Sequence, residues 1–219
     1  MTQPTAFSYS RLNSFEECPK KFHALSISKS FKEKESPPML EGKRVHKALE
    51  LRIKLNRKLP DDLTKHEPMM QRLAAAPGVK LTEYQMAVTQ EYQPTDWFAS
   101  NVWCRAIADL AIKKDDRAAL FDYKTGKMSN DFSQMRLTGA VFMHLHPEVM
   151  HVTLAYVWLK DKQTTTEKMA RADIGEVWGS LMPRIKNYQT AFEQTAFPAR
   201  PGRQCKWCPV KTCPYWEGE

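Results

Sequence analysis

The strongest constraint on the fold is a pair of apolar, strand-like segments that flank a short polar turn and carry charged residues inside them. Asp109 lies before the turn, and Asp122 and Lys124 lie after it. Side chains two residues apart in a strand leave the same face, so Asp122 and Lys124 share a face. In an antiparallel hairpin centred on Asp115 and Asp116, Asp109 is directly opposite Asp122, with Cβ atoms about 4.5–5.5 Å apart.

Two carboxylates so placed repel each other unless a positive charge lies between them. Their oxygens suit Mg²⁺ or Mn²⁺, and Lys124 stands one pleat along, where it can hold negative charge or activate water. The alternative is a surface hairpin whose charges are solvated or paired as Asp–Lys. A register shifted by one residue would also move Asp109 to the other face. The apolar flanking residues favour a buried sheet and therefore the metal site.

A histidine on an amphipathic helix provides a third candidate ligand. In the helix expected over about 40–55, His46, Leu49 and Ile53 follow helical spacing, so His46 points with the apolar stripe toward the core. Gly42, one turn earlier, would let another chain or a ligand come close. His46 is therefore a third metal ligand or a phosphate contact, or else a hydrogen-bonded core histidine.

Composition limits the classes of protein that remain. The chain has 219 residues, 42% of them hydrophobic and 26% charged, which supports a packed core and argues against disorder. A net charge of +8 suits a polyanionic partner such as DNA or RNA without identifying one. No apolar run approaches membrane-spanning length and no signal-peptide pattern opens the chain, so we expect a cytoplasmic protein that binds no membrane.

Periodicity and breaker residues predict a single α/β domain with a mixed central β-sheet flanked by helices. The expected helices are a short one within 8–22 and those at 40–55, 69–76, 132–144 and 174–195, and the expected strands lie at 80–91, 101–112, 117–124 and 149–159, with an edge strand at 162–170. We expect one domain over 1–219, with a core at about 38–196 and terminal elements at about 8–30 and 197–219.

Cysteine usage indicates a ligand site. Cys205, Cys208 and Cys213 crowd together near the C-terminus, and Cys18 lies far away in sequence. The odd total of five cysteines argues against a disulfide framework. Four thiolates suit either zinc or an iron–sulfur cluster, and Cys18 alone could be a small buried hydrophobe. Cys104 lies on the strand face opposite Asp109, which predicts a core position.

Three segments together resemble a known family. "EGKRVHKALE", "IADL" and "FDYKTGK" are similar to motifs of the PD-(D/E)xK nuclease superfamily, in particular its RecB-type branch with the CRISPR spacer-acquisition nuclease and phage recombination exonucleases. The matching positions are Gly42 to His46, Asp109, the run Asp122-Tyr123-Lys124, and Gln134 in the next helix. Thr138 stands where the family usually has Tyr. Glu83 is a candidate for a further family carboxylate, although no compact motif marks it.

This resemblance implies a restriction-endonuclease-like core and metal-dependent hydrolysis of DNA phosphodiester bonds. His46, Asp109, Asp122 and Tyr123 would hold Mg²⁺ or Mn²⁺. Lys124 would orient or deprotonate the attacking water, and Gln134 would complete the catalytic set. The expected activity is that of an exonuclease on single strands or DNA ends, in recombination, repair or phage DNA metabolism.

The resemblance also implies a fate for the four cysteines. Iron–sulfur members of the RecB-type branch place one Cys before the nuclease core and three after it, as Cys18, Cys205, Cys208 and Cys213 are placed here. A 4Fe–4S cluster would then join the N-terminal helix to the C-terminal tail, and a zinc knuckle is the alternative. Trp207, Tyr215 and Trp216 either stack on bases or cover the cluster.

Other functions remain open at this stage. One is a structure-specific endonuclease on the same fold, and another is a DNA-binding subunit of a helicase or integrase assembly. The chain has no Walker-type phosphate loop, so any helicase motor belongs to a partner. The basic runs "CPKKF", "GKRVHK" and "LRIKLNRK" either line a phosphate path or form solvated helix faces, and an oligomer is open as well.

Overall fold

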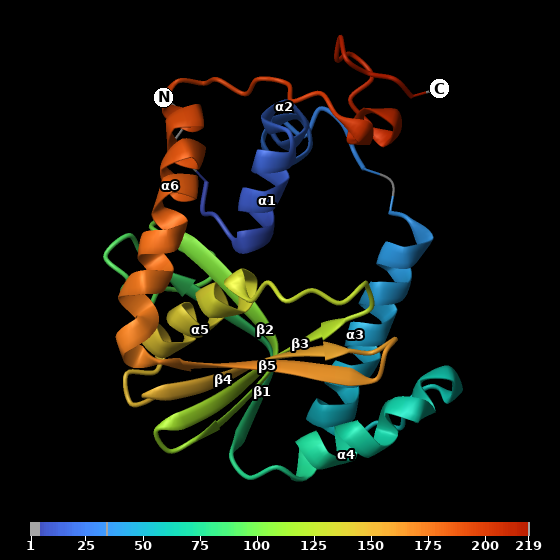
Figure 1. Ribbon diagram of the computed structural model, residues 1–219, viewed down its shortest axis with the longest axis vertical. Coiled ribbons are helices and arrows are strands. Elements are labelled where there is room, and N and C mark those ends of the chain that lie inside the picture. The colour runs from blue at the N-terminus through green and yellow to red at the C-terminus, as the bar shows by residue number, and fades with distance from the viewer. Residues whose placement is uncertain (1–4, 34, 219) are drawn as a thin grey trace. The chain divides into compact units, whose positions relative to one another are not determined.

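The computed structural model describes residues 5–33 and 35–218 and divides into two compact units (Figure 1). The larger unit spans 36–178, and the smaller unit combines the first 35 residues with 179–219. Residues 179–196, which the sequence assigned to the core, thus belong to the unit built from the chain ends. Within the described ranges, no helix combines the length and apolar character that crossing a membrane requires.

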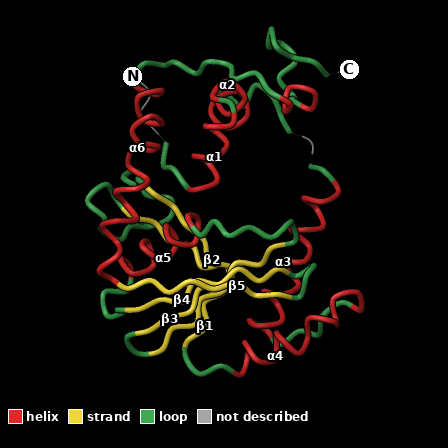
Figure 2. The backbone as a smooth tube through the Cα atoms, viewed as in Figure 1, coloured by secondary structure: helices red, strands yellow, loops and turns green. Residues whose placement is uncertain are grey.

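One mixed five-stranded sheet forms the centre of the larger unit (Figure 2). Its strands are adjacent in chain order: β1 (Val79–Val88), β2 (Cys104–Lys114), β3 (Arg117–Lys124), β4 (His151–Trp158) and β5 (Gln163–Ala170). Strands β3 and β4 pair in parallel, and the other neighbours pair antiparallel. A parallel pair needs a crossover, and here helix α5 (Ser133–Leu145) supplies it. The mixed α/β sheet expected from the sequence is confirmed.

The β2–β3 hairpin has the predicted register. Leu110 pairs with Phe121, and Lys114 pairs with Arg117 at the turn, where Asp115 takes a left-handed conformation with φ 52°. Asp and Asn tolerate this conformation better than most side chains, which suits Asp115 to a tight turn. The ladder stops at the Leu110–Phe121 pair, one position short of Asp109 and Asp122. The hairpin therefore opens where its two carboxylates lie.

Helices α3 (Pro37–Leu55) and α5 cover the two faces of this sheet. The other helices of the described chain are α1 (Tyr9–Glu17), α2 (Pro19–Phe22), α4 (Glu67–Ala75) and α6 (Ile174–Glu193), with π-helical or 3-10 turns at His23–Ile27, Asp61–His66, Arg171–Asp173 and Arg203–Trp207. Helix α3 ends at Asn56 in a left-handed cap with φ 53°. Pro183 lies inside α6.

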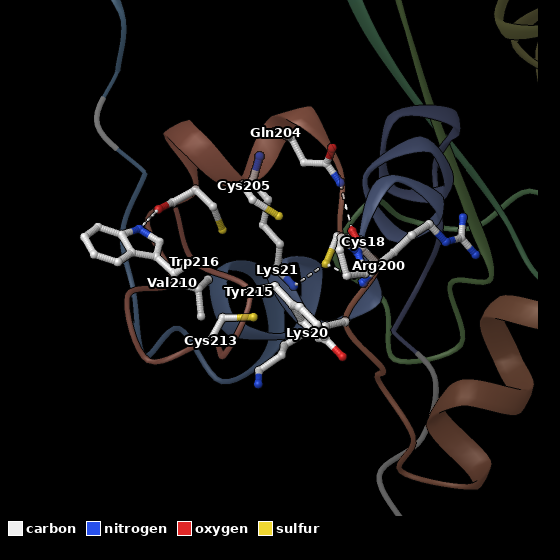
Figure 3. Close-up of a pocket in the computed structure, with 13 residues that line it drawn as sticks. Cys18, Lys20, Lys21, Arg200, Gln204, Cys205, Val210, Cys213, Tyr215 and Trp216 are labelled. Atoms are coloured by element: carbon white, nitrogen blue, oxygen red, sulfur yellow. Dashed lines mark hydrogen bonds between the residues drawn. The ribbon is translucent and has the colours of Figure 1, made fainter. Parts of the chain in front are cut away.

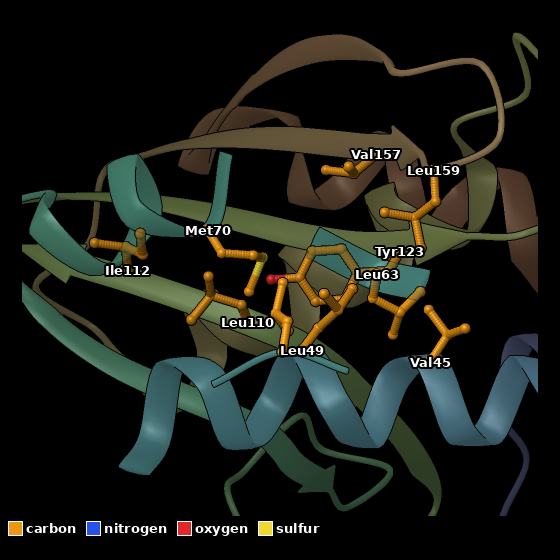
Figure 4. Packing of buried hydrophobic residues seen from close by; sticks show 10 residues of the cluster. Val45, Leu49, Leu63, Met70, Leu110, Ile112, Tyr123, Val157 and Leu159 are labelled. Carbon is orange, nitrogen blue, oxygen red and sulfur yellow. The ribbon is translucent and has the colours of Figure 1, made fainter. Parts of the chain in front are cut away.

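The core beneath α3 fixes that helix on the sheet (Figure 4). Val45 and Leu49 of α3 pack with Leu110, Tyr123 and Val157 from three adjacent strands. Leu49 is fully buried, so its truncation to Ala would cost about 2–5 kcal/mol. This packing holds the polar residue between Val45 and Leu49, His46, close to the open end of the hairpin.

Helix α5 lies on the opposite face of the sheet. A Cβ at Gly139 would come within 3.0 Å of Leu154 and 3.2 Å of Met169, so a larger residue here would require these side chains to shift by a few tenths of an ångström. The close contact brings the first turn of α5, with Gln134, over the face that carries Asp122. The two covering helices thus deliver one site residue each.

The smaller unit has its own aromatic core. Tyr188 of α6 contacts Phe15 and Phe22, with ring centroids 5.4 and 5.6 Å apart. Arg184 makes a two-pronged ion pair with Glu16 of α1, with Nε 2.7 Å from Oε1. These contacts tie the first helix of the chain to its last long helix, and they place Cys18 at the end of α1.

Candidate metal-dependent active site

Asp109 occupies the point at which β2 and β3 separate. Its Oδ2 accepts a 2.6 Å hydrogen bond from the backbone N–H of Tyr123, in the position where a ladder bond would otherwise continue. The side chain is buried, at 9% exposure. Because the backbone donor fixes one carboxylate oxygen, the other oxygen is directed at the neighbouring groups.

His46 of α3 contacts that second oxygen. The distance from His46 Nδ1 to Asp109 Oδ1 is 3.3 Å. Burial disfavours the imidazolium, but the hydrogen bond and negative charge of Asp109 outweigh it and raise the pKa of His46. A cation bound here would replace the proton, since imidazole ligates metals in its neutral form.

Glu83 of β1 completes a group of three possible ligands. Oxygen or nitrogen atoms of His46, Glu83 and Asp109 all lie within 4.8 Å of one another. The register of β1 with β2 places Glu83 opposite Asp109, yet the pairing is interrupted there because Glu83 has φ 46°. A left-handed backbone at a non-glycine residue within a strand costs on the order of 1–3 kcal/mol, and such strain clusters at functional sites.

Two like charges this close perturb each other. Burial, followed by the charge of Asp109, raises the pKa of Glu83. The sequence marked Glu83 only as a carboxylate without a motif. No local signal could have strengthened that choice, because the β1–β2 register depends on a long connection that forms no hairpin turn.

A second group lies on the same face of β3. Lys124 Nζ is 2.7 Å from Asp122 Oδ2 and donates to Gln134 Oε1 at 3.2 Å. Gln134 Nε2 in turn donates to Asp122 Oδ1 at 3.3 Å. Burial and the charge of Asp109 raise the pKa of Asp122 to about 6, against the opposing effect of Lys124. Asp122, Lys124 and Gln134 therefore form a closed triangle beside the three-ligand group.

The side chains of Tyr123 and Thr138, two further positions noted in the sequence, are buried and do not join the polar groups described above. The Tyr123 side chain is 2% exposed and packs in the core beneath α3, on the face opposite Asp122. Its contribution to a metal could come only from its backbone. Thr138 is buried in α5, where its hydroxyl donates to the Gln134 carbonyl at 3.0 Å, so it supports the residue that precedes it by one turn.

The donor set fits a hard divalent cation. Carboxylate oxygens of Asp109 and Glu83 and the imidazole of His46 lie within 4.8 Å of one another. The Asp122 carboxylate is close enough that the charges of Asp109 and His46 act on its pKa, and it is paired with Lys124. Mg²⁺ and Mn²⁺ prefer such oxygen-rich sites. The same cation would relieve the repulsion that perturbs the pKa values of Glu83 and Asp122.

The four predicted ligand cysteines meet in the smaller unit. Cys18, Cys205, Cys208 and Cys213 all line one pocket, in which the sulfurs of Cys18, Cys205 and Cys213 point toward a common centre (Figure 3). None of the five cysteines forms a disulfide. Cys18 Sγ accepts hydrogen bonds from the backbone N–H groups of Lys21 at 3.5 Å and Arg200 at 3.4 Å.

The spacing of these sulfurs bears on which group they fit. A tetrahedral zinc with Zn–S bonds near 2.3 Å brings its sulfurs to about 3.8 Å from one another. Across the part of the chain that the structure describes, no three thiols lie mutually within 4.8 Å. The thiols as placed are therefore not drawn together as the ligands of a bound zinc ion are. Cys104, the fifth cysteine, is buried in β2, where burial raises the pKa of its thiol, as expected of a core residue.

Comparison with known proteins agrees with this geometry. The model of the PD-(D/E)XK nuclease superfamily matches residues 6–214. The chain therefore belongs to the PD-(D/E)XK nuclease superfamily, and its restriction-endonuclease-like fold and its class as a nuclease follow. No curated protein matches the chain in sequence.

Solved structures show similar folds at low sequence identity. A Eubacterium rectale protein provisionally named as an exonuclease is 12% identical with a TM-score of 0.53, and the match covers 89% of this chain and 84% of that one. The protein SSO0001 is 13% identical with a TM-score of 0.47, over 99% of this chain and 89% of that one.

Proposed function

We propose that this protein is a metal-dependent DNA exonuclease of the RecB-type branch, acting on single strands or DNA ends. The observation that carries the proposal is the opened end of the β2–β3 hairpin. There, the His46–Glu83–Asp109 group lies beside the Asp122–Lys124–Gln134 triangle. The net charge of +8 agrees with a polyanionic substrate. The E. rectale structural neighbour is itself provisionally named as an exonuclease.

His46, Glu83, Asp109 and Asp122 would hold the metal, with a backbone contribution from Tyr123. A divalent cation bound there supplies an acidified water and neutralises charge on the phosphate. Lys124 orients the attacking water through its ammonium and faces the negative charge that develops on the phosphate oxygens. Gln134 fixes Lys124 and Asp122 at once, since its amide donates to one and accepts from the other.

We further propose that Cys18, Cys205, Cys208 and Cys213 hold a 4Fe–4S cluster. Their convergence on one pocket and the absence of a disulfide among them support a shared ligand role, and their order of one Cys before the core and three after it supports the choice of a cluster. Structural zinc is the alternative, and elemental analysis separates the two. Because the ligands come from both ends of the chain, loss of the group should loosen the smaller unit.

The test is cleavage of DNA labelled separately at each end, with anaerobically purified protein and Mn²⁺ or Mg²⁺. Exonuclease action predicts stepwise release of label from one end and no cleavage of closed circular single strands. Lys124→Ala should abolish cleavage while leaving the protein folded. Cleavage of closed circles would indicate an endonuclease, and inactivity of folded, metal-loaded protein would indicate a DNA-binding subunit that needs a helicase or integrase partner.

A further inference from the structure

The C-terminal residues include two tryptophans that differ in their surroundings. Trp216 lines the pocket of the four thiols (Figure 3), and it is partly buried. Trp207 is 79% exposed and does not line that pocket. Of these two tryptophans, Trp216 is therefore the one placed to affect the group that the thiols hold.

Trp216 is bonded to two of the cysteine-bearing turns. Its indole Nε1–H donates to the Cys208 carbonyl at 2.9 Å, and its backbone N–H donates to the Cys213 carbonyl at 3.0 Å. One residue thereby joins the backbone at two of the four thiol positions. Loss of the indole would remove the hydrogen bond to the Cys208 carbonyl, because the Trp216 side chain is its donor, whereas the backbone bond to Cys213 would remain.

The outer surface of the indole is also occupied. Lys211 Nζ lies 5.6 Å from the centre of the Trp216 ring, within the range of a cation–π interaction. A Cβ at Gly218 would come within 2.9 Å of the same ring and 3.0 Å of the Lys206 carbonyl. The end of the described chain thus folds against the indole so closely that a side chain at Gly218 would collide with it.

We propose that Trp216 is a positioning residue for the group held by the four cysteines. Its two hydrogen bonds fix the turns of Cys208 and Cys213 and so hold their thiols in the pocket. This inference rests on the proposed role of the four cysteines as ligands, and it does not depend on nuclease activity. A ring that both packs and donates one hydrogen bond also suggests how the two contributions can be separated.

The test compares three variants with the wild type. Each protein is purified without oxygen, its iron and zinc are quantified, and metal release to excess ferrozine, or to a zinc chelator if zinc is found, is followed optically. Trp216→Ala should release metal about three- to tenfold faster than wild type, the range expected from the loss of one hydrogen bond and the packing of its ring. Trp216→Phe keeps the ring without the donor and should lie between the two. Trp207→Ala should match the wild type.

The possible results separate the role of Trp216 from the ligand role of the four cysteines on which it rests. Equal release rates for Trp216→Phe, Trp207→Ala and wild type, all metal-loaded, would overturn the role of Trp216 and leave the cysteine site intact. Wild-type protein that contains neither iron nor zinc would overturn the cysteine site itself. Should Trp216→Ala fail to load metal at all, the comparison of Trp216→Phe with Trp207→Ala still decides the matter.

Discussion

Replacement of Glu83 by Gln should change thermal stability in opposite directions without and with metal. Ligand atoms of Glu83 and Asp109 lie within 4.8 Å, and a pair of charges at that distance repels by about 3.5 kcal/mol at an effective dielectric of 20 and about 0.9 kcal/mol in water. Although partial burial of the carboxyl raises the pKa of Glu83, the residue as a whole is exposed to solvent, so water screens the pair and the lower figure applies. The substitution should therefore stabilise metal-free protein by about 1 kcal/mol, or about 2–4 °C in Tm.

Saturating Mn²⁺ should reverse this order. A cation at one hundred times its Kd stabilises the folded protein by about 2.7 kcal/mol, and a variant that lacks one carboxylate ligand should receive less of that gain. The assay is thermal unfolding of wild type and Glu83→Gln in EDTA and in Mn²⁺. Glu217→Gln, an exposed change outside the helices and strands, serves as the charge-matched control. A Glu83→Gln protein that is destabilised in EDTA, or that gains as much from Mn²⁺ as the wild type, would refute the reasoning.

Further consequences of the site can be measured separately. Lys124→Ala should lower the cleavage rate on the order of 10²-fold or more, and Gln134→Ala should have a smaller effect in the same direction, as steady-state kinetics at saturating Mn²⁺ would show. Because the pKa of Asp122 is raised to about 6, metal affinity should fall as pH drops below that value, and metal-free protein should lose stability as pH rises from 3.8 toward 6. Asp122→Asn should remove that pH dependence of unfolding; an unchanged profile would contradict the burial argument. Leu49→Ala should cost about 2–5 kcal/mol in urea unfolding. Cys18→Ser should abolish the iron or zinc content of the purified protein, whereas Cys104→Ser should leave that content unchanged, as elemental analysis would show.

The local part of the active site follows from the sequence. Asp109 and Asp122 belong to one hairpin with a tight turn, so counting outward from Asp115 and Asp116 gives the register that the structure has. The inward face of His46 follows equally from helical periodicity, because Val45 and Leu49 on either side of it are buried. The spacing of Cys205, Cys208 and Cys213 predicts ligand chemistry without any knowledge of the fold.

Only the tertiary structure decided the remainder. Glu83 joins the site through a strand pairing whose register no short turn fixes, so the sequence could not place it opposite Asp109. The side chain of Tyr123, adjacent in sequence to two site residues, lies in the core on the opposite face. Gln134 reaches Asp122 and Lys124 because Gly139 allows α5 close to the sheet. Turn and helix geometry fix residues that are near in sequence, whereas residues far apart are brought together only by packing, whose outcome depends on the whole chain.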